Sequence, residues 1–200
     1  MDTINNDKRG IFLDDFRLQD FKKFVGYLIE AGSKMGRHYF QLAVAGKENP
    51  IFRERVYCYE LYHQLRCIME RTFPYELDGE VDKAGHPIIR KAKKPDFIVH
   101  APGNMERNLA VIEVKDIKVN ERLEDLRKDL NTLKYFLKKA AYYYGIVLVY
   151  GDGWNPIPVP IVQEVKGFLK KYNLSIMLMW HRGPNEKLEI LLDNFMRKEI

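Results

Sequence analysis

The chain has 200 residues, of which 46% are hydrophobic and 12% aromatic. This composition excludes a disordered chain and is sufficient for one well-packed domain. With 33 basic and 28 acidic residues the net charge is +5, which permits a phosphate-rich partner without requiring one. No apolar run approaches the roughly 20 residues of a membrane span, and no charged-then-apolar leader opens the chain. We therefore expect a cytoplasmic protein with no membrane partner.

Three helices are predicted in the first third of the chain. Apolar residues recur at helical spacing across residues 16–29, and the polar residues before about residue 10 are expected to be loose. A short helical stretch is expected over residues 35–45. The pair Asn49 and Pro50 is typical of a helix start, so a third helix should run from there to about residue 69.

The third helix carries a polar stripe that contains a candidate site residue. Arg53, Tyr57, Glu60 and Gln64 stand at i, i+4, i+7 and i+11 and should share one face. A solvated helix face is the equal alternative for this stripe. The residues expected to face the core are Val56, Tyr59, Leu61, Tyr62, Leu65, Ile68 and Met69.

A half-exposed strand is predicted next, because apolar and acidic residues alternate across residues 75–81. A turn at 82–85 leads back through Ile88 and Ile89 into a basic run. Such a run is usually a solvated edge, although cations beside an acidic patch would also suit a polyanion. The run consists of Arg90, Lys91, Lys93 and Lys94.

Two apolar strands, 95–99 and 109–115, should form a hairpin that carries one acid on each strand. Residues equidistant from the turn pair in an antiparallel hairpin, so Asp96 should face Glu113. Glu113 and Lys115 share a face because side chains alternate along a strand. Buried charges are costly unless they are paired or bind a metal, so this convergence predicts a site. The alternative is a turn-capping Asp96 beside a surface ion pair of Glu113 and Lys115.

The second half of the chain alternates helices with apolar strands. A leucine stripe predicts a helix over residues 121–139, followed by a strand over 142–150, a helix from Pro160 and a strand over 174–180. Residues 186–200 fit either a strand or a helix. The element order is helix, three antiparallel strands, helix, strand, helix, strand, which predicts an α/β fold.

A Pro-Asp pair that opens one strand, Glu-Val-Lys that closes the next and a glutamate on the preceding helix resemble the PD-(D/E)XK nuclease superfamily. The resemblance covers roughly residues 50–180 and implies a restriction-endonuclease-like core. This core is a central four- to five-stranded mixed sheet flanked by helices. We expect it within a nuclease-like domain of residues 50–200, with residues 1–49 as an N-terminal helical region packed on it.

The resemblance implies a metal-dependent nuclease that hydrolyses phosphodiester bonds with metal-activated water as nucleophile. Carried over residue by residue, Asp96, Glu113, Glu60 and the backbone carbonyl of Val114 would hold the metal, and Lys115 would be the catalytic lysine. Mg²⁺ is the expected cofactor, with Mn²⁺ able to substitute. Lys115, partly desolvated near a metal, is expected to have a lowered pKa and to orient or help deprotonate the attacking water.

The expected partner is nucleic acid, with DNA favoured over RNA. Double-strand cleavage by this fold commonly implies a homodimer, which is a further expectation. The alternative function is a non-catalytic nucleic-acid-binding or assembly module that retains the nuclease fold. A third hypothesis is a structural interaction protein whose strand-end charges only pair with each other.

Overall fold

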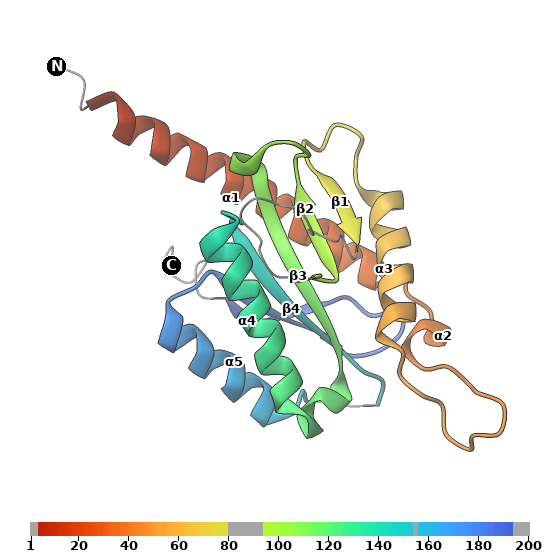
Figure 1. Ribbon diagram of the computed structural model, residues 1–200. Coiled ribbons are helices and arrows are strands. Elements are labelled where there is room, and N and C mark those ends of the chain that lie inside the picture. Colours follow the sequence, from red (N-terminus) through yellow and green to blue (C-terminus); the bar gives the residue numbers. More distant parts are fainter. Residues whose placement is uncertain (1–3, 80–93, 154–155, 194–200) are drawn as a thin grey trace.

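The computed structural model describes residues 4–79, 94–153 and 156–193 (Figure 1). A six-stranded mixed sheet lies at the centre and helices flank it. The helices are α1 (Ile4–Gly32), α2 (Arg37–Phe40), α3 (Glu54–Ile68), α4 (Leu123–Lys139) and α5 (Val159–Tyr172). The strands are β1 (Glu76–Gly79), β2 (Phe97–His100), β3 (Asn108–Asp116), β4 (Tyr144–Tyr150), β5 (Ile176–His181) and β6 (Glu189–Asp193).

The strands follow one another across the sheet in chain order, from β1 to β6. β1, β2 and β3 are antiparallel, β3, β4 and β5 are parallel, and β6 is antiparallel to β5. The predicted α/β class and the three successive antiparallel strands are therefore confirmed. The expectation of four to five strands is wrong, because the ambiguous tail supplies a sixth strand that pairs with β5.

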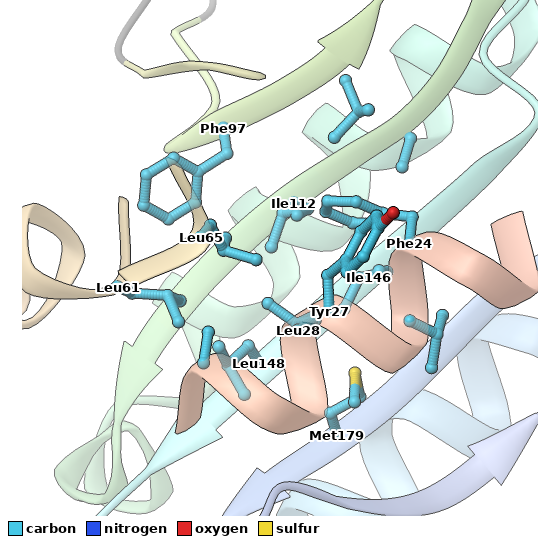
Figure 2. Close-up of a cluster of buried hydrophobic side chains, with 14 of the residues drawn as sticks. Phe24, Tyr27, Leu28, Leu61, Leu65, Phe97, Ile112, Ile146, Leu148 and Met179 are labelled. Carbon is cyan, nitrogen blue, oxygen red and sulfur yellow. The ribbon is translucent and has the colours of Figure 1, made fainter. Parts of the chain in front are cut away.

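Two hydrophobic clusters cover the two faces of the sheet. α4 and α5 lie over one face (Figure 1). There Leu126, Leu130 and Leu133 belong to the same buried cluster as Val111 and Val147. α1 and α3 lie over the other face. Figure 2 shows their contribution there, with Phe24, Tyr27 and Leu28 of α1 and Leu61 and Leu65 of α3 meeting strand residues Phe97, Ile112, Ile146, Leu148 and Met179.

The N-terminal helix is longer than its apolar pattern indicates. The chain is helical from Ile4, so the loose stretch expected before residue 10 is wrong. Gly10 lies inside this helix, and one interior glycine costs only about 1 kcal/mol relative to alanine, which does not force a break. No helix among the described residues combines the length and the apolar character needed to cross a membrane.

The segment between α1 and α3 is less helical than predicted. The helix expected over residues 35–45 is only the single turn α2, and α3 begins at Glu54 rather than near Pro50. The reason is a short antiparallel bridge between Leu42 and Ile51, which exchange two backbone hydrogen bonds of 2.9 Å. Pro50 therefore lies in a loop, where its fixed φ and missing N–H are tolerated.

Candidate active site

The hairpin of β2 and β3 has the predicted register. Phe97 pairs with Ile112, and continuing that register by one residue places Asp96 opposite Glu113. The Asp96 side chain also binds β3 directly, because its Oδ2 accepts a hydrogen bond of 2.7 Å from the backbone N–H of Val114. The structure therefore brings both predicted carboxylates to one place.

The β2–β3 ladder ends at the pair of Phe97 and Ile112, so Pro95 and Asp96 precede the strand. Pro95 has no N–H, so it cannot donate a ladder hydrogen bond to the carbonyl of Val114. The N–H of Val114 is already used by Asp96. A proline before the first acid therefore has a local physical role, since it interrupts the ladder beside the two carboxylates.

The two carboxyl groups are buried and perturb each other. Glu113 is only 5% exposed, and burial, followed by the charges of Asp96 and Asp129, raises its pKa well above the ordinary value. Burial also raises the pKa of Asp96, while the Val114 N–H and Lys115 oppose that rise. Two buried carboxyl groups this close favour a state in which they hold one proton between them. A bound cation would replace this proton.

Lys115 is held between two acids from two helices. Its Nζ lies 3.0 Å from Glu54 Oε2 of α3 and 3.2 Å from Asp129 Oδ2 of α4, and the side chain is 16% exposed. Burial alone would lower the pKa of Lys115, but Asp129 and Glu54 outweigh it and raise the pKa above its ordinary value. The protein groups around Lys115 alone therefore do not produce the lowered pKa that was expected beside a metal. Lys115 is a fixed ammonium that donates hydrogen bonds.

The inner face of α3 is confirmed at Leu61 and Leu65, which were expected in the core, but it also includes Tyr57. Glu54, Cys58, Leu61 and Leu65 have the spacing i, i+4, i+7 and i+11, and the last three are buried. Tyr57, placed in the polar stripe by sequence, is fully buried. Its ring stacks on another core aromatic, Tyr150, with centroids 3.8 Å apart, and its hydroxyl lies 2.7 Å from His181 Nδ1.

Glu60 is the one predicted site residue that the structure does not bring to the carboxylate pair. Its Oε1 accepts a hydrogen bond of 2.6 Å from Gln64 Nε2 on the same helix. The helix acid beside Lys115 is Glu54, which also acts on the pKa of Asp96. Tyr59, expected in the core, is 63% exposed. Both differences concern single positions, since Leu61 and Leu65 face the core as expected.

Asp129 is a further acid of the site that sequence reasoning missed. It lies on α4 among the buried residues Leu126, Leu130 and Leu133, and its side chain is only 16% exposed. Burial raises the pKa of Asp129 to about 6, although Lys115 opposes this rise. In the sequence, Asp129 stands three residues after Leu126 and four before Leu133, so it shares the apolar face of the helix, which was the signal for a buried acid.

The site has more negative than positive charge. Asp96, Glu113, Glu54 and Asp129 surround one ammonium, that of Lys115. No three His, Cys, Asp or Glu side chains in the described ranges are placed to hold a metal ion together. Mg²⁺, however, keeps several waters and is commonly bound by one or two carboxylates. Asp96, Glu113 and the Val114 carbonyl therefore fit a hard divalent cation.

A pocket of about 370 Å³ adjoins Asp96, and we call it the α3–β1 pocket. It opens between α3 and the edge of the sheet formed by β1 and β2. Its lining residues are Cys58, Tyr59, Tyr62, Asp78, Gly79, Asp96 and Phe97. Of the basic run expected nearby, Arg90, Lys91 and Lys93 lie outside the described residues, and Lys94 is exposed.

Comparison with known proteins adds no family assignment. No protein-family model matches the sequence, and neither a curated protein nor a solved structure matches the chain significantly. The resemblance to PD-(D/E)XK nucleases therefore depends on the residues and the topology described above.

Proposed function

We propose that this protein is a Mg²⁺-dependent nuclease of the PD-(D/E)XK type that hydrolyses phosphodiester bonds in nucleic acid, with DNA as the favoured substrate. The observation that carries the proposal is the contact of Asp96 with β3, where its Oδ2 accepts a hydrogen bond from the backbone N–H of Val114, the residue after Glu113. Lys115 follows Glu113 by two residues on the same face of β3. Three antiparallel strands followed by parallel β3 and β4, with helices on both faces, are compatible with a restriction-endonuclease-like core.

Each residue has a role that its contacts support. Asp96, Glu113 and the Val114 carbonyl would hold the cation, which supplies a nucleophilic hydroxide near neutral pH and neutralises charge on the phosphate. Lys115, protonated and fixed by Glu54 and Asp129, would donate a hydrogen bond to a phosphate oxygen as charge develops there.

Cleavage of labelled DNA and RNA, single- and double-stranded, tests the proposal in the presence of Mg²⁺. We expect wild-type protein to cut at least one of these substrates and EDTA to stop it. Asp96→Asn and Lys115→Ala should each lower the rate by roughly a hundredfold or more, the cost of losing a ligand or donor that stabilises the transition state. Glu70→Gln and Lys34→Ala remove an acid and a lysine from exposed surface ion pairs and are the matched controls.

Cleavage that survives Asp96→Asn or Lys115→Ala would contradict this assignment. Wild-type protein that binds nucleic acid with Mg²⁺ present but does not cut it would instead support the non-catalytic binding module. Circular dichroism of each variant separates loss of chemistry from loss of fold.

A further inference from the structure

The C-terminal halves of α4 and α5 lie side by side and carry lysines without acids (Figure 1). Neither residues 130–139 of α4 nor residues 165–172 of α5 include Asp or Glu. The lysines of these two segments, which we call the lysine patch, are Lys134, Lys138, Lys139, Lys166, Lys170 and Lys171. All of them except Lys134 are exposed. Because the whole chain has a net charge of only +5, its positive excess is concentrated in this patch.

Three lysines of the patch surround one aromatic ring and do not pair with acids. The Nζ atoms of Lys134, Lys171 and Lys138 lie 4.0, 5.2 and 5.9 Å from the centroid of the Tyr172 ring. No lysine of the patch forms an ion pair with a carboxylate of the described residues. The surface lysine Lys23, in contrast, lies 2.9 Å from a carboxylate oxygen. No described acid therefore compensates the charge of the patch.

The helix dipole accounts for only part of this charge. Lysines are common in the last turn of a helix, because each helix end carries roughly half a negative charge. Two helix ends together need about one positive charge. The patch supplies several more, and this surplus fits an external anion.

A groove of about 500 Å³ between α4 and α5 adjoins the patch. Lys171 and Tyr172 are among its lining residues, together with the polar Asn131. The acid among the described lining residues is Glu164, which Arg127 neutralises by donating two hydrogen bonds of 2.9 and 2.8 Å. Exposed lysines spread along two helices contact several charges in a row, so this surface suits an extended polyanion better than a single small ion.

We propose that the lysine patch and the adjoining groove bind the phosphate backbone of nucleic acid, away from the site of cleavage. The choice of nucleic acid over another polyanion rests on the proposed function. Along α4, Lys134 and Lys139 follow Asp129 of the candidate active site by about 8 and 15 Å of helix axis, so a strand of several nucleotides can span both. Phosphate contacts fix the position of the nucleic acid and carry no sequence preference.

Fluorescence anisotropy with labelled DNA and RNA, single-stranded and duplex, tests the patch directly. The titrations are made in EDTA, where metal-dependent cleavage cannot proceed, and at several salt concentrations. The test variant combines Lys134→Gln, Lys138→Gln and Lys171→Gln, which keep a good helix former at each position. We expect its affinity to fall at least about tenfold. The slope of log affinity against log salt concentration should become shallower by about 2–3, since each lost phosphate contact contributes about 0.7–0.9.

The matched control removes the same charge from exposed positions outside the patch. It combines Lys23→Gln, Lys34→Gln and Lys187→Gln, and we expect affinity and salt slope close to those of wild type. An equal loss of affinity in this control would show that net charge alone governs binding, which would overturn the patch proposal.

The outcomes separate the patch from the chemistry. Wild-type affinity and salt slope in the test variant, or no binding of any probe by wild type, would overturn the patch proposal even if the wild type cuts DNA. Binding that depends on the patch, in a protein that does not cut nucleic acid with Mg²⁺, would overturn the nuclease function and retain the patch. Displacement of the probes by polyglutamate at a lower concentration of charge than by unlabelled DNA would indicate an acidic polypeptide and overturn the choice of nucleic acid.

Discussion

At the scale of single residues, Lys115 shows how the environment of a group decides its chemistry. A buried lysine with no partner would have a lowered pKa and could serve as a base. Glu54 and Asp129 reverse that direction and hold the ammonium in place. Removing one partner of a buried ion pair leaves the other charge uncompensated, which is costly. Glu54 and Asp129 are thus positioning residues for Lys115.

Substituting each of two glutamates of α3 tests which of them supports the site: Glu54, as in the structure, or Glu60, as predicted from the sequence. Glu54→Gln removes the carboxylate that is 3.0 Å from Lys115, whereas Glu60→Gln changes a group whose contact is with Gln64. We expect Glu54→Gln to lower the cleavage rate by roughly tenfold or more, in the range of supporting residues around a metal site. The loss at Glu60 should be smaller. Initial rates measured with saturating Mg²⁺ check this, and an equal or larger loss at Glu60 would contradict the geometry.

The sequence was sufficient to predict that Asp96 and Glu113 lie together, but not to predict which residues surround them. Asp96, Glu113 and Lys115 could be related because strand geometry repeats every two residues and a hairpin has one natural register. Helix phase is less well determined, since a buried tyrosine with a satisfied hydroxyl resembles a polar residue in the sequence. Tyr57 is such a case, because it was predicted to share the polar stripe with Glu60 but is fully buried.

At the scale of elements, the strands and the two C-terminal helices followed from hydrophobic patterns. α4 and α5 carry apolar stripes that cover β3, β4 and β5, and their predicted positions are correct to within a few residues. The loop before α3 was not predictable in this way, because its shape depends on the tertiary bridge between Leu42 and Ile51. β6 was ambiguous for a similar reason, since pairing with β5 decides between strand and helix.

The packing of α1 on the sheet predicts a large effect for one substitution in that helix. Phe24 is fully buried in the cluster that α1 shares with α3 and the strands (Figure 2). Phe24→Ala should lower the free energy of unfolding by about 3–5 kcal/mol, the usual cost of removing a buried aromatic ring. Phe16→Ala, in the same helix at a position that is 67% exposed, should change it by less than about 0.5 kcal/mol.

Urea unfolding followed by circular dichroism measures both changes. A loss of less than about 1 kcal/mol at Phe24 would show that α1 contributes little to the folded core. An effect at Phe16 as large as that at Phe24 would contradict the burial pattern along this helix.

At the scale of the whole molecule, the fold buries more negative charge than it neutralises. An acid whose pKa is raised on folding binds protons more tightly in the folded state, so the free energy of unfolding falls as pH rises through that range. For Asp129 this range extends from its ordinary value of 3.8 to about 6. Asp96 and Glu113 contribute in the same direction. Lys115 makes the opposite contribution to the free energy of unfolding, because its raised pKa adds stability at neutral pH that is lost only at high pH.

The excess of buried acids over bases at the site also makes cation binding depend on pH. Carboxylates must lose their protons before they can bind a metal, so affinity rises with pH and binding releases protons. The proton shared by Asp96 and Glu113 is the one that a cation would displace. We therefore expect Mn²⁺ to bind well at about pH 7 and roughly tenfold or more weakly at about pH 5.

Calorimetric titration of the protein with Mn²⁺ is the most direct test, because cation binding by Asp96 and Glu113 is the claim from which the proposed function follows. The expected result is binding by wild type that strengthens as pH rises, is lost in Glu113→Gln and is retained in the surface control Glu70→Gln. Binding that is equal in Glu113→Gln and wild type, or no binding at about pH 7 by a folded protein, would contradict the account.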